Sequence, residues 1–215
     1  MRTLQRYYRH VILSGKKVIL IDDVEGYQDG CVEPHFHGNG PTILKEKAAD
    51  ILMKNQILRI DFPFAEENSL SLHEGYLHAK PENEKKEQVI DRQDYLSCAY
   101  QTKNSRCKCV TVLFSANENE ETPVITAARG QDVMELRIEE KGRTERYLIN
   151  CRADGSVMHH NGWAVWDGFE TDALIVGLFY ESQGGLESFF IQNGSTLRTQ
   201  NEVLFSSNIK STVKS

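Results

Sequence analysis

Apolar and polar positions alternate along much of the chain with the two-residue period of a β-strand. The segment 57–62 is typical, because its even-numbered positions are apolar and Arg59 and Asp61 stand between them. Side chains of a strand point alternately to its two faces, so this pattern predicts a half-buried strand. The run 18–21 is apolar throughout, which predicts a strand covered on both faces.

Residues that favour turns separate these segments. They are Ser14-Gly15-Lys16, Lys54-Asn55, Gly142, Asp154-Gly155, Asn161-Gly162, Gly184-Gly185 and Asn193-Gly194. Many short strands with regular turns, and no convincing amphipathic helix, predict an all-β protein with a large antiparallel sandwich of the supersandwich type. We find neither a blade-length repeat nor a linker, and therefore expect one domain over residues 1–215.

Composition narrows the class of protein. The chain has 215 residues, of which 40% are hydrophobic and 26% charged, so it is long enough to bury a core. A net charge of −6 gives no electrostatic reason to expect nucleic acid as a partner. No apolar run approaches the roughly 20 residues of a membrane span, so we expect no membrane partner.

Two features bear on localisation without deciding it. Residues 1–10 lack the apolar core of a secretory signal, so either the protein stays inside the cell or the chain is a piece of a longer one. Five cysteines cannot all form disulfides, and Cys107 and Cys109 are too close for an easy bridge. We expect mostly reduced thiols, which slightly favours a reducing compartment.

The most informative motif is Glu33-Pro34-His35-Phe36-His37-Gly38, which follows a β-rich run. In an extended strand His35 and His37 point to the same face. Together they could bind a metal, or one could bind it while the other transfers a proton. The alternative is a pair of half-exposed histidines with no chemical role.

A zinc site needs three or four ligands, so further residues must join this pair. Asp50, Asp61, His73 and His78 are near in sequence, and we expect Asp50 and His73 to complete a zinc site with His37. His73 and His78 enclose Tyr76, in a stretch that could equally be an exposed loop.

Aromatic residues offer other chemistry. Trp163 and Trp166 could form a platform for a sugar ring, although core packing is the commoner role. The stretch 95–100 begins and ends with tyrosine, and a tyrosine can act as a general acid or base if its pKa is lowered.

Several stretches, in order from about residue 6 to 207, resemble the C-terminal β-domain of heparinase II/III-type polysaccharide lyases and their alginate-lyase relatives. They are Tyr8-Arg9-His10-Val11-Ile12-Leu13, Val18 to Asp22, Pro34-His35-Phe36-His37, Tyr95-x-Ser97-x-x-Tyr100, Val110 to Phe114, Phe189 to Gly194 and Val203 to Ser206.

The resemblance implies a β-sandwich packed beside an α/α-toroid domain, in enzymes that cleave uronic-acid polysaccharides by β-elimination. It implies that His35 is the histidine of the cleft, that His37 binds a structural zinc and that Tyr100 faces the substrate. For the acidic polysaccharide itself we expect contacts from Arg9, Tyr76 and Trp163.

The chain departs from the family in two respects. The toroid is absent from these residues, and Leu96 stands where a relative has a carboxylate. We therefore expect half a cleft, which would need a toroid on the same or another chain, and no full lyase activity from this chain alone.

Two other functions remain open. One is a non-catalytic carbohydrate-binding sandwich that uses Trp163 and Trp166. The other is a small cupin-like metal protein, although residues 38–41 lack the glutamate that such proteins have after the His-x-His pair.

Overall fold

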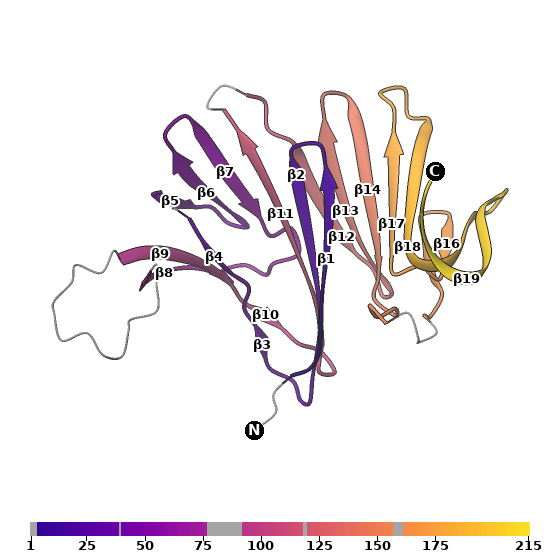
Figure 1. Cartoon of the computed structure of the whole chain (residues 1–215), viewed down its shortest axis with the longest axis horizontal. Coiled ribbons are helices and arrows are strands. Elements are labelled where there is room, and N and C mark those ends of the chain that lie inside the picture. Colours follow the sequence, from indigo (N-terminus) through magenta and orange to yellow (C-terminus); the bar gives the residue numbers. More distant parts are fainter. Residues whose placement is uncertain (1–3, 39, 77–91, 118–119, 157–160) are drawn as a thin grey trace. The chain divides into compact units, whose positions relative to one another are not determined.

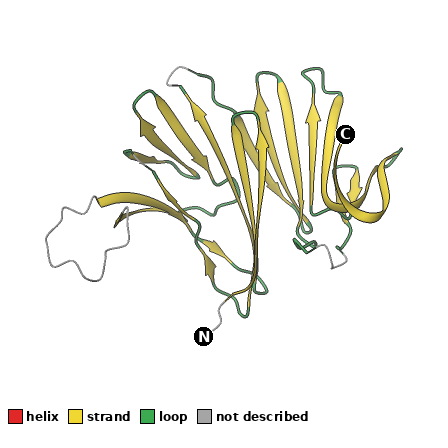
Figure 2. Ribbon diagram, in the orientation of Figure 1, coloured by secondary structure: helices red, strands yellow, loops and turns green. Residues whose placement is uncertain are grey.

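The computed structural model describes residues 4–38, 40–76, 92–117, 120–156 and 161–215 (Figure 1). These residues form strands, turns and loops, with no helix among them (Figure 2). Among these residues, no helix is long and apolar enough to cross a membrane. The predicted all-β, antiparallel, sandwich-like class is confirmed.

The chain divides into two compact units, Met1–Glu121 and Thr122–Ser215. The first unit contains three antiparallel sheets and the second unit one, among the described residues. That residues 1–215 form one domain stays a prediction.

A six-stranded sheet forms the larger layer of the first unit, in the order β1-β2-β11-β7-β6-β5. Its strands are β1 (Leu4–Ser14), β2 (Lys17–Gly26), β5 (Thr42–Leu44), β6 (Ala48–Met53), β7 (Gln56–Asp61) and β11 (Arg106–Ala116). The predicted turn at Lys54-Asn55 is confirmed, because Met53 pairs with Gln56 across it.

Two smaller sheets complete the first unit. One has the order β4-β9-β8, with β4 (His35–His37), β9 (Arg92–Cys98) and β8 (Leu70–Tyr76). The other pairs β10 (Tyr100–Gln101) with β3 (Cys31–Val32).

An apolar core joins these layers. Ile51 and Ile60 from the large sheet lie in one buried cluster with Leu96 from β9 and with Phe62, and Phe36 from β4 packs against it. Burying a side chain of this size stabilises the fold by about 1.5–3 kcal/mol. Because Phe36 and Leu96 point inward, their neighbours on β4 and β9 must point to the opposite face.

The second unit is an eight-stranded sheet in the order β12-β13-β14-β17-β18-β16-β15, with β19 also paired to β18. Its strands are β12 (Val124–Arg129), β13 (Val133–Glu140), β14 (Arg143–Asn150), β15 (Ala164–Trp166), β16 (Phe169–Thr171), β17 (Ile175–Tyr180), β18 (Leu186–Thr199) and β19 (Val203–Lys214). Trp166 donates from its indole nitrogen to Glu135 on β13 at 2.6 Å. Since β15 and β13 are far apart in the strand order, this bond shows that the sheet curls.

The predicted turn at Asn193-Gly194 is wrong, because both residues lie within strand β18. Asn193 has a φ of +53° and the pairing with β19 shifts between Ile191 and Gly194, which is the geometry of a β-bulge. A Cβ on Gly194 would lie 2.5 Å from the Cα of Ala173. The Asn-Gly pair therefore marks a bulge and a close backbone approach.

The predicted turns at Gly142 and Gly184-Gly185 are confirmed, because β13 pairs with β14 and β17 pairs with β18 across them. The predicted turns at Asp154-Gly155 and Asn161-Gly162 stay predictions, because the strand expected between them lies mostly outside the described residues. Asp154-Gly155 lies in a loop after β14, and Asn161-Gly162 precedes β15 without joining two described strands. Asn150 organises this loop, since its side chain accepts from the Arg152 amide at 2.8 Å and donates to the Gly162 carbonyl at 2.7 Å. Residues 157–160, which include His159 and His160, lie outside the described residues.

Candidate functional site

The histidine pair lies on the sheet β4-β9-β8. His35 pairs with Ser97 and His37 pairs with Tyr95 across β4 and β9. On the other side of β9, Tyr95 pairs with His73 of β8. Directly paired residues of an antiparallel sheet share a face, so these side chains all lie on the face opposite Phe36.

Three imidazole rings surround the phenol ring of Tyr95 on this face. The ring centroids of His35, His37 and His73 lie 5.1, 5.3 and 5.0 Å from that of Tyr95. The His37 and His73 rings are stacked with it, at interplanar angles of 29° and 21°. All three histidines are exposed and Tyr95 is half-buried. We call these four residues the histidine–tyrosine face.

Two polar side chains lie close to imidazoles of this face, Ser97 to that of His73 and Glu33 to that of His35. Nε2 of His73 lies 3.0 Å from Oγ of Ser97, which is 3% exposed. Nε2 of His35 lies 3.6 Å from a carboxylate oxygen of Glu33. A group bonded to one ring nitrogen influences which nitrogen bears the proton, and so which one is presented to a ligand. The face therefore presents imidazoles, a type of group that can exchange protons near neutral pH, and one of them is hydrogen-bonded to Ser97.

The predicted zinc ligands are not gathered at one point. Asp50 lies on β6, where Arg59 and Lys45 form ion pairs with its carboxylate. Burial alone would raise the pKa of Asp50, but these hydrogen bonds outweigh it and lower that pKa. Within the described ranges no group of three histidine, cysteine or acidic residues could bind a metal ion. His37, Asp50 and His73 do not fit a zinc ion in this arrangement, and zinc stays a prediction.

Tyr100, predicted to face the substrate, is 5% exposed and belongs to the core of the first unit. Its hydroxyl donates to the Val110 carbonyl at 3.3 Å. Burial, followed by the neighbouring cysteines, raises the pKa of this hydroxyl well above its usual range. Tyr100 is therefore not part of the histidine–tyrosine face, and Tyr95 is the tyrosine found there.

The three residues predicted to contact the polysaccharide lie on different elements. Arg9 on β1 is bonded to both oxygens of Asp22, at 2.6 and 2.9 Å. Trp163 belongs to the second unit, is 47% exposed and has the guanidinium of Arg198 at 5.3 Å from its ring. Tyr76 ends β8, and its side chain lies outside what is described, as does all of His78.

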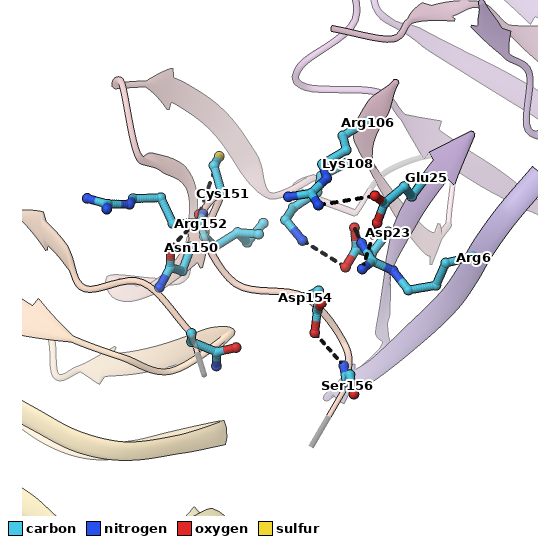
Figure 3. A network of polar contacts seen from close by, with 12 residues as sticks. Arg6, Asp23, Glu25, Arg106, Lys108, Asn150, Cys151, Arg152, Asp154 and Ser156 are labelled. Carbon is cyan, nitrogen blue, oxygen red and sulfur yellow. Dashed lines mark hydrogen bonds and ion pairs between the residues drawn. The ribbon is translucent and has the colours of Figure 1, made fainter. Parts of the chain in front are cut away.

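A charged cluster on β1, β2 and β11 of the first unit is internally paired (Figure 3). Arg6 lies 3.3 Å from Asp23 and 2.9 Å from Glu25. Lys108 lies 3.0 Å from Asp23, and Arg106 lies 3.1 Å from Glu25. Each carboxylate thus has two cationic partners, so the charges of the cluster are largely compensated within it.

An open hollow of about 410 Å³ is also present in the first unit. Lys45, Glu46, Glu67, Asn68 and Leu70 line it. None of these residues belongs to the histidine–tyrosine face. The hollow contains no histidine, tyrosine or cysteine, so we do not assign chemistry to it.

Tyr95 is the site residue that sequence reasoning missed in favour of Tyr100. The alternation in the sequence could have identified it. Leu96 and Cys98 are apolar and would point to the core, so Tyr95 and Ser97 would point to the opposite face of the strand. The position of Tyr100 depends on the break after β9, which local periodicity does not predict.

No family model matches the chain, and no curated protein matches it. The function is therefore argued from the residues and their geometry.

Proposed function

We propose that the first unit binds an acidic polysaccharide on the histidine–tyrosine face and contributes this face to a β-elimination site. The observation on which this proposal depends is the gathering of three exposed imidazoles around one phenol ring. The class of reaction comes from the resemblance of the sequence to heparinase II/III-type lyases.

The groups on the face suit that reaction. β-Elimination removes the proton at C5 of a uronate and expels the oxygen linked at C4, which takes up a proton. An imidazole is a suitable base near neutral pH, and a phenol or a second imidazole can supply the proton to the leaving oxygen. His35, with Glu33 at 3.6 Å, is the candidate base, and Tyr95 is the candidate acid.

The face is also suited to the ligand. Aromatic rings stack with the apolar faces of sugars, and protonated or N–H-donating imidazoles bind carboxylates. An exposed face on one sheet encloses only one side of a polymer. We infer that a second structural element, such as the toroid of the resembling enzymes, closes the site, and that the chain alone binds without efficient cleavage.

Binding to uronate polymers tests the proposal. Calorimetric titration with polygalacturonate and alginate oligosaccharides should give binding, and a neutral glucan should give none. His37→Ala and His73→Ala should each weaken uronate binding by about 10- to 100-fold, as expected for loss of a hydrogen bond to a charged group. Trp163→Ala is the matched control and should leave the affinity unchanged.

Ultraviolet absorbance of the unsaturated uronate product tests the chemical step separately. We expect little or no product from this chain by itself. Equal binding by the wild type and both histidine variants would refute the proposed face.

A second candidate is a non-catalytic carbohydrate-binding protein that uses the second unit. The observation in its favour is the exposed Trp163 ring with Arg198 beside it. Arg198 is also bonded to Glu170 at 2.6 Å, which fixes the guanidinium in place. Binding that is lost in Trp163→Ala and retained in the histidine variants would select this candidate.

A further inference from the structure

Ser97 is a buried polar residue on β9, the central strand of the small sheet β4-β9-β8 (Figure 1). It pairs with His35 of β4 on one side and with Ser71 of β8 on the other. Because Ser97 is two positions from Tyr95, its side chain points to the same side of the sheet as the histidine–tyrosine face. Ser97 is only 3% exposed, so it acts on a ligand at this face through the side chains that cover it.

The hydroxyl of Ser97 has a single hydrogen-bond partner among the described residues. Its Oγ lies 3.0 Å from Nε2 of His73, and no other bond of this hydroxyl is found there. A hydroxyl has one proton to donate, and a buried donor without an acceptor destabilises a protein. The bond therefore runs from the Ser97 hydroxyl, as donor, to Nε2 of His73, as acceptor.

The direction of this bond sets the tautomer of the His73 ring. In a neutral imidazole one ring nitrogen bears a proton and the other accepts a hydrogen bond. Since Nε2 of His73 accepts from Ser97, the proton of the neutral ring is on Nδ1. His73 is exposed, and no side chain in the described ranges is hydrogen-bonded to Nδ1, so this N–H can donate to a ligand.

The tautomers give two imidazoles of the face different roles. Neutral His73 can donate to a uronate carboxylate, but its Nε2 lone pair is already bonded and does not serve as a base. The carboxylate of Glu33, 3.6 Å from Nε2 of His35, favours a proton on that nitrogen and leaves Nδ1 of His35 as the base. One ring is thus set to bind and the other to accept a proton.

We propose that Ser97 is a positioning residue that holds neutral His73 as the N–H donor for the uronate carboxylate. This inference deepens the proposed function and rests on it for the identity of the ligand. Other titratable groups at this face, among the described residues, are Tyr95, His37 and His35, with Glu33 beside His35. Of these, Tyr95 stacks on the His73 ring, whereas Ser97 makes the hydrogen bond that decides where the ring proton lies.

Nitrogen NMR of the labelled full chain tests the tautomer without any polysaccharide. Long-range proton–nitrogen correlation distinguishes a protonated ring nitrogen from an unprotonated one, and the spectrum of His73→Gln identifies the His73 signals. At pH 8 the wild type should have the proton on Nδ1. Ser97→Thr keeps a hydroxyl and should keep this tautomer, whereas Ser97→Ala should give a mixture of both. Ser71→Ala removes a hydroxyl from the same side of the sheet and is the matched control, which should match the wild type.

The pH dependence of uronate affinity tests the role of Ser97 in binding. At pH 8 Ser97→Ala should bind polygalacturonate about 2- to 5-fold more weakly than the wild type, because only the fraction of rings with a proton on Nδ1 is competent to bind. An imidazolium donates from both nitrogens whatever its neighbour does, so the difference should disappear at pH 5. A merely structural role would weaken binding equally at both pH values.

The two measurements separate failure of this inference from failure of the proposed function. The inference is overturned if the proton of neutral His73 in the wild type is on Nε2, or if Ser97→Ala keeps the wild-type tautomer. It is also overturned if the loss of affinity in Ser97→Ala is the same at pH 8 and pH 5. Absence of uronate binding by the wild type would instead overturn the proposed function, because the tautomer is measured in the free chain.

Discussion

Replacing Asp61 with asparagine should make the protein more stable at neutral pH. Asp61 ends β7, and within the described residues its Oδ2 has neither solvent contact nor a hydrogen-bond partner. Burial, only partly offset by the charge of Arg59, raises the pKa of this carboxyl from 3.8 to about 6. The ionised form is therefore disfavoured in the folded protein.

The magnitude follows from linkage between protonation and folding. Below the pKa of the unfolded state, Asp61 is protonated in both the folded and the unfolded protein, so its ionisation does not reduce the free energy of unfolding. Between the unfolded and folded values the folded state binds more protons, so stability falls as pH rises. A shift of about two pKa units at 1.36 kcal/mol each makes the full cost about 3 kcal/mol above pH 6.

Thermal unfolding from pH 4 to pH 8 checks this reasoning. Asp61→Asn should unfold at a temperature about 6 to 12 °C higher than the wild type at pH 8, and the two should converge near pH 4. Asp50→Asn is the matched control and should show the opposite effect, a lower unfolding temperature than the wild type at pH 8. Arg59 and Lys45 lower the pKa of Asp50, so its carboxylate stabilises the folded protein at neutral pH, and this stabilisation is lost on acidification. A difference between Asp61→Asn and wild type that does not change with pH would refute the argument.

Four other changes test separate parts of the structure. Asp172→Ala should lower the free energy of unfolding by about 2–4 kcal/mol in chemical denaturation, because the Asp172 carboxylate accepts three hydrogen bonds from residues 195 and 196. Asp172→Asn should lower it clearly less, and an equal loss in the two variants would contradict this. Ser105→Gly should raise the free energy of unfolding by about 0.5–1 kcal/mol, because Ser105 has a φ of +61°, a backbone conformation that glycine adopts without strain. A loss of stability would contradict this. Gly177→Ala should lower the melting temperature, because a Cβ would lie 2.1 Å from the Phe190 ring, and an unchanged melting temperature would contradict this. Tyr100→Phe should cost about 1 kcal/mol and leave uronate binding unchanged, and lost binding would place Tyr100 back in the site.

The sequence predicted well those features that depend on neighbours along the chain. The period of two placed Leu58 and Ile60 on one side of a strand, and Ile60 is indeed buried. The same period put His35 and His37 on a common face, and both rings do lie beside Tyr95. In each case the physical cause, alternation of side chains along a strand, is local.

Features that depend on distant parts of the chain were not predictable in the same way. Asp50 is bonded to Arg59 because β6 and β7 pair in one register, and a shift by one residue would have turned that carboxylate to the other face. Asn193-Gly194 has the composition of a turn, but the close approach of Ala173 makes it a bulge within a long strand. Strand register and packing between strands decide such cases.

Uronate binding by a single variant tests the central claim most directly. Tyr95→Ala removes the ring around which the three imidazoles gather and keeps the strand in place. Titration with polygalacturonate should show an affinity about 3- to 10-fold below that of the wild type, as expected for loss of an aromatic stack, while Trp163→Ala matches the wild type. Unchanged affinity in Tyr95→Ala, or a loss confined to Trp163→Ala, would contradict the assignment of this face as the polysaccharide site.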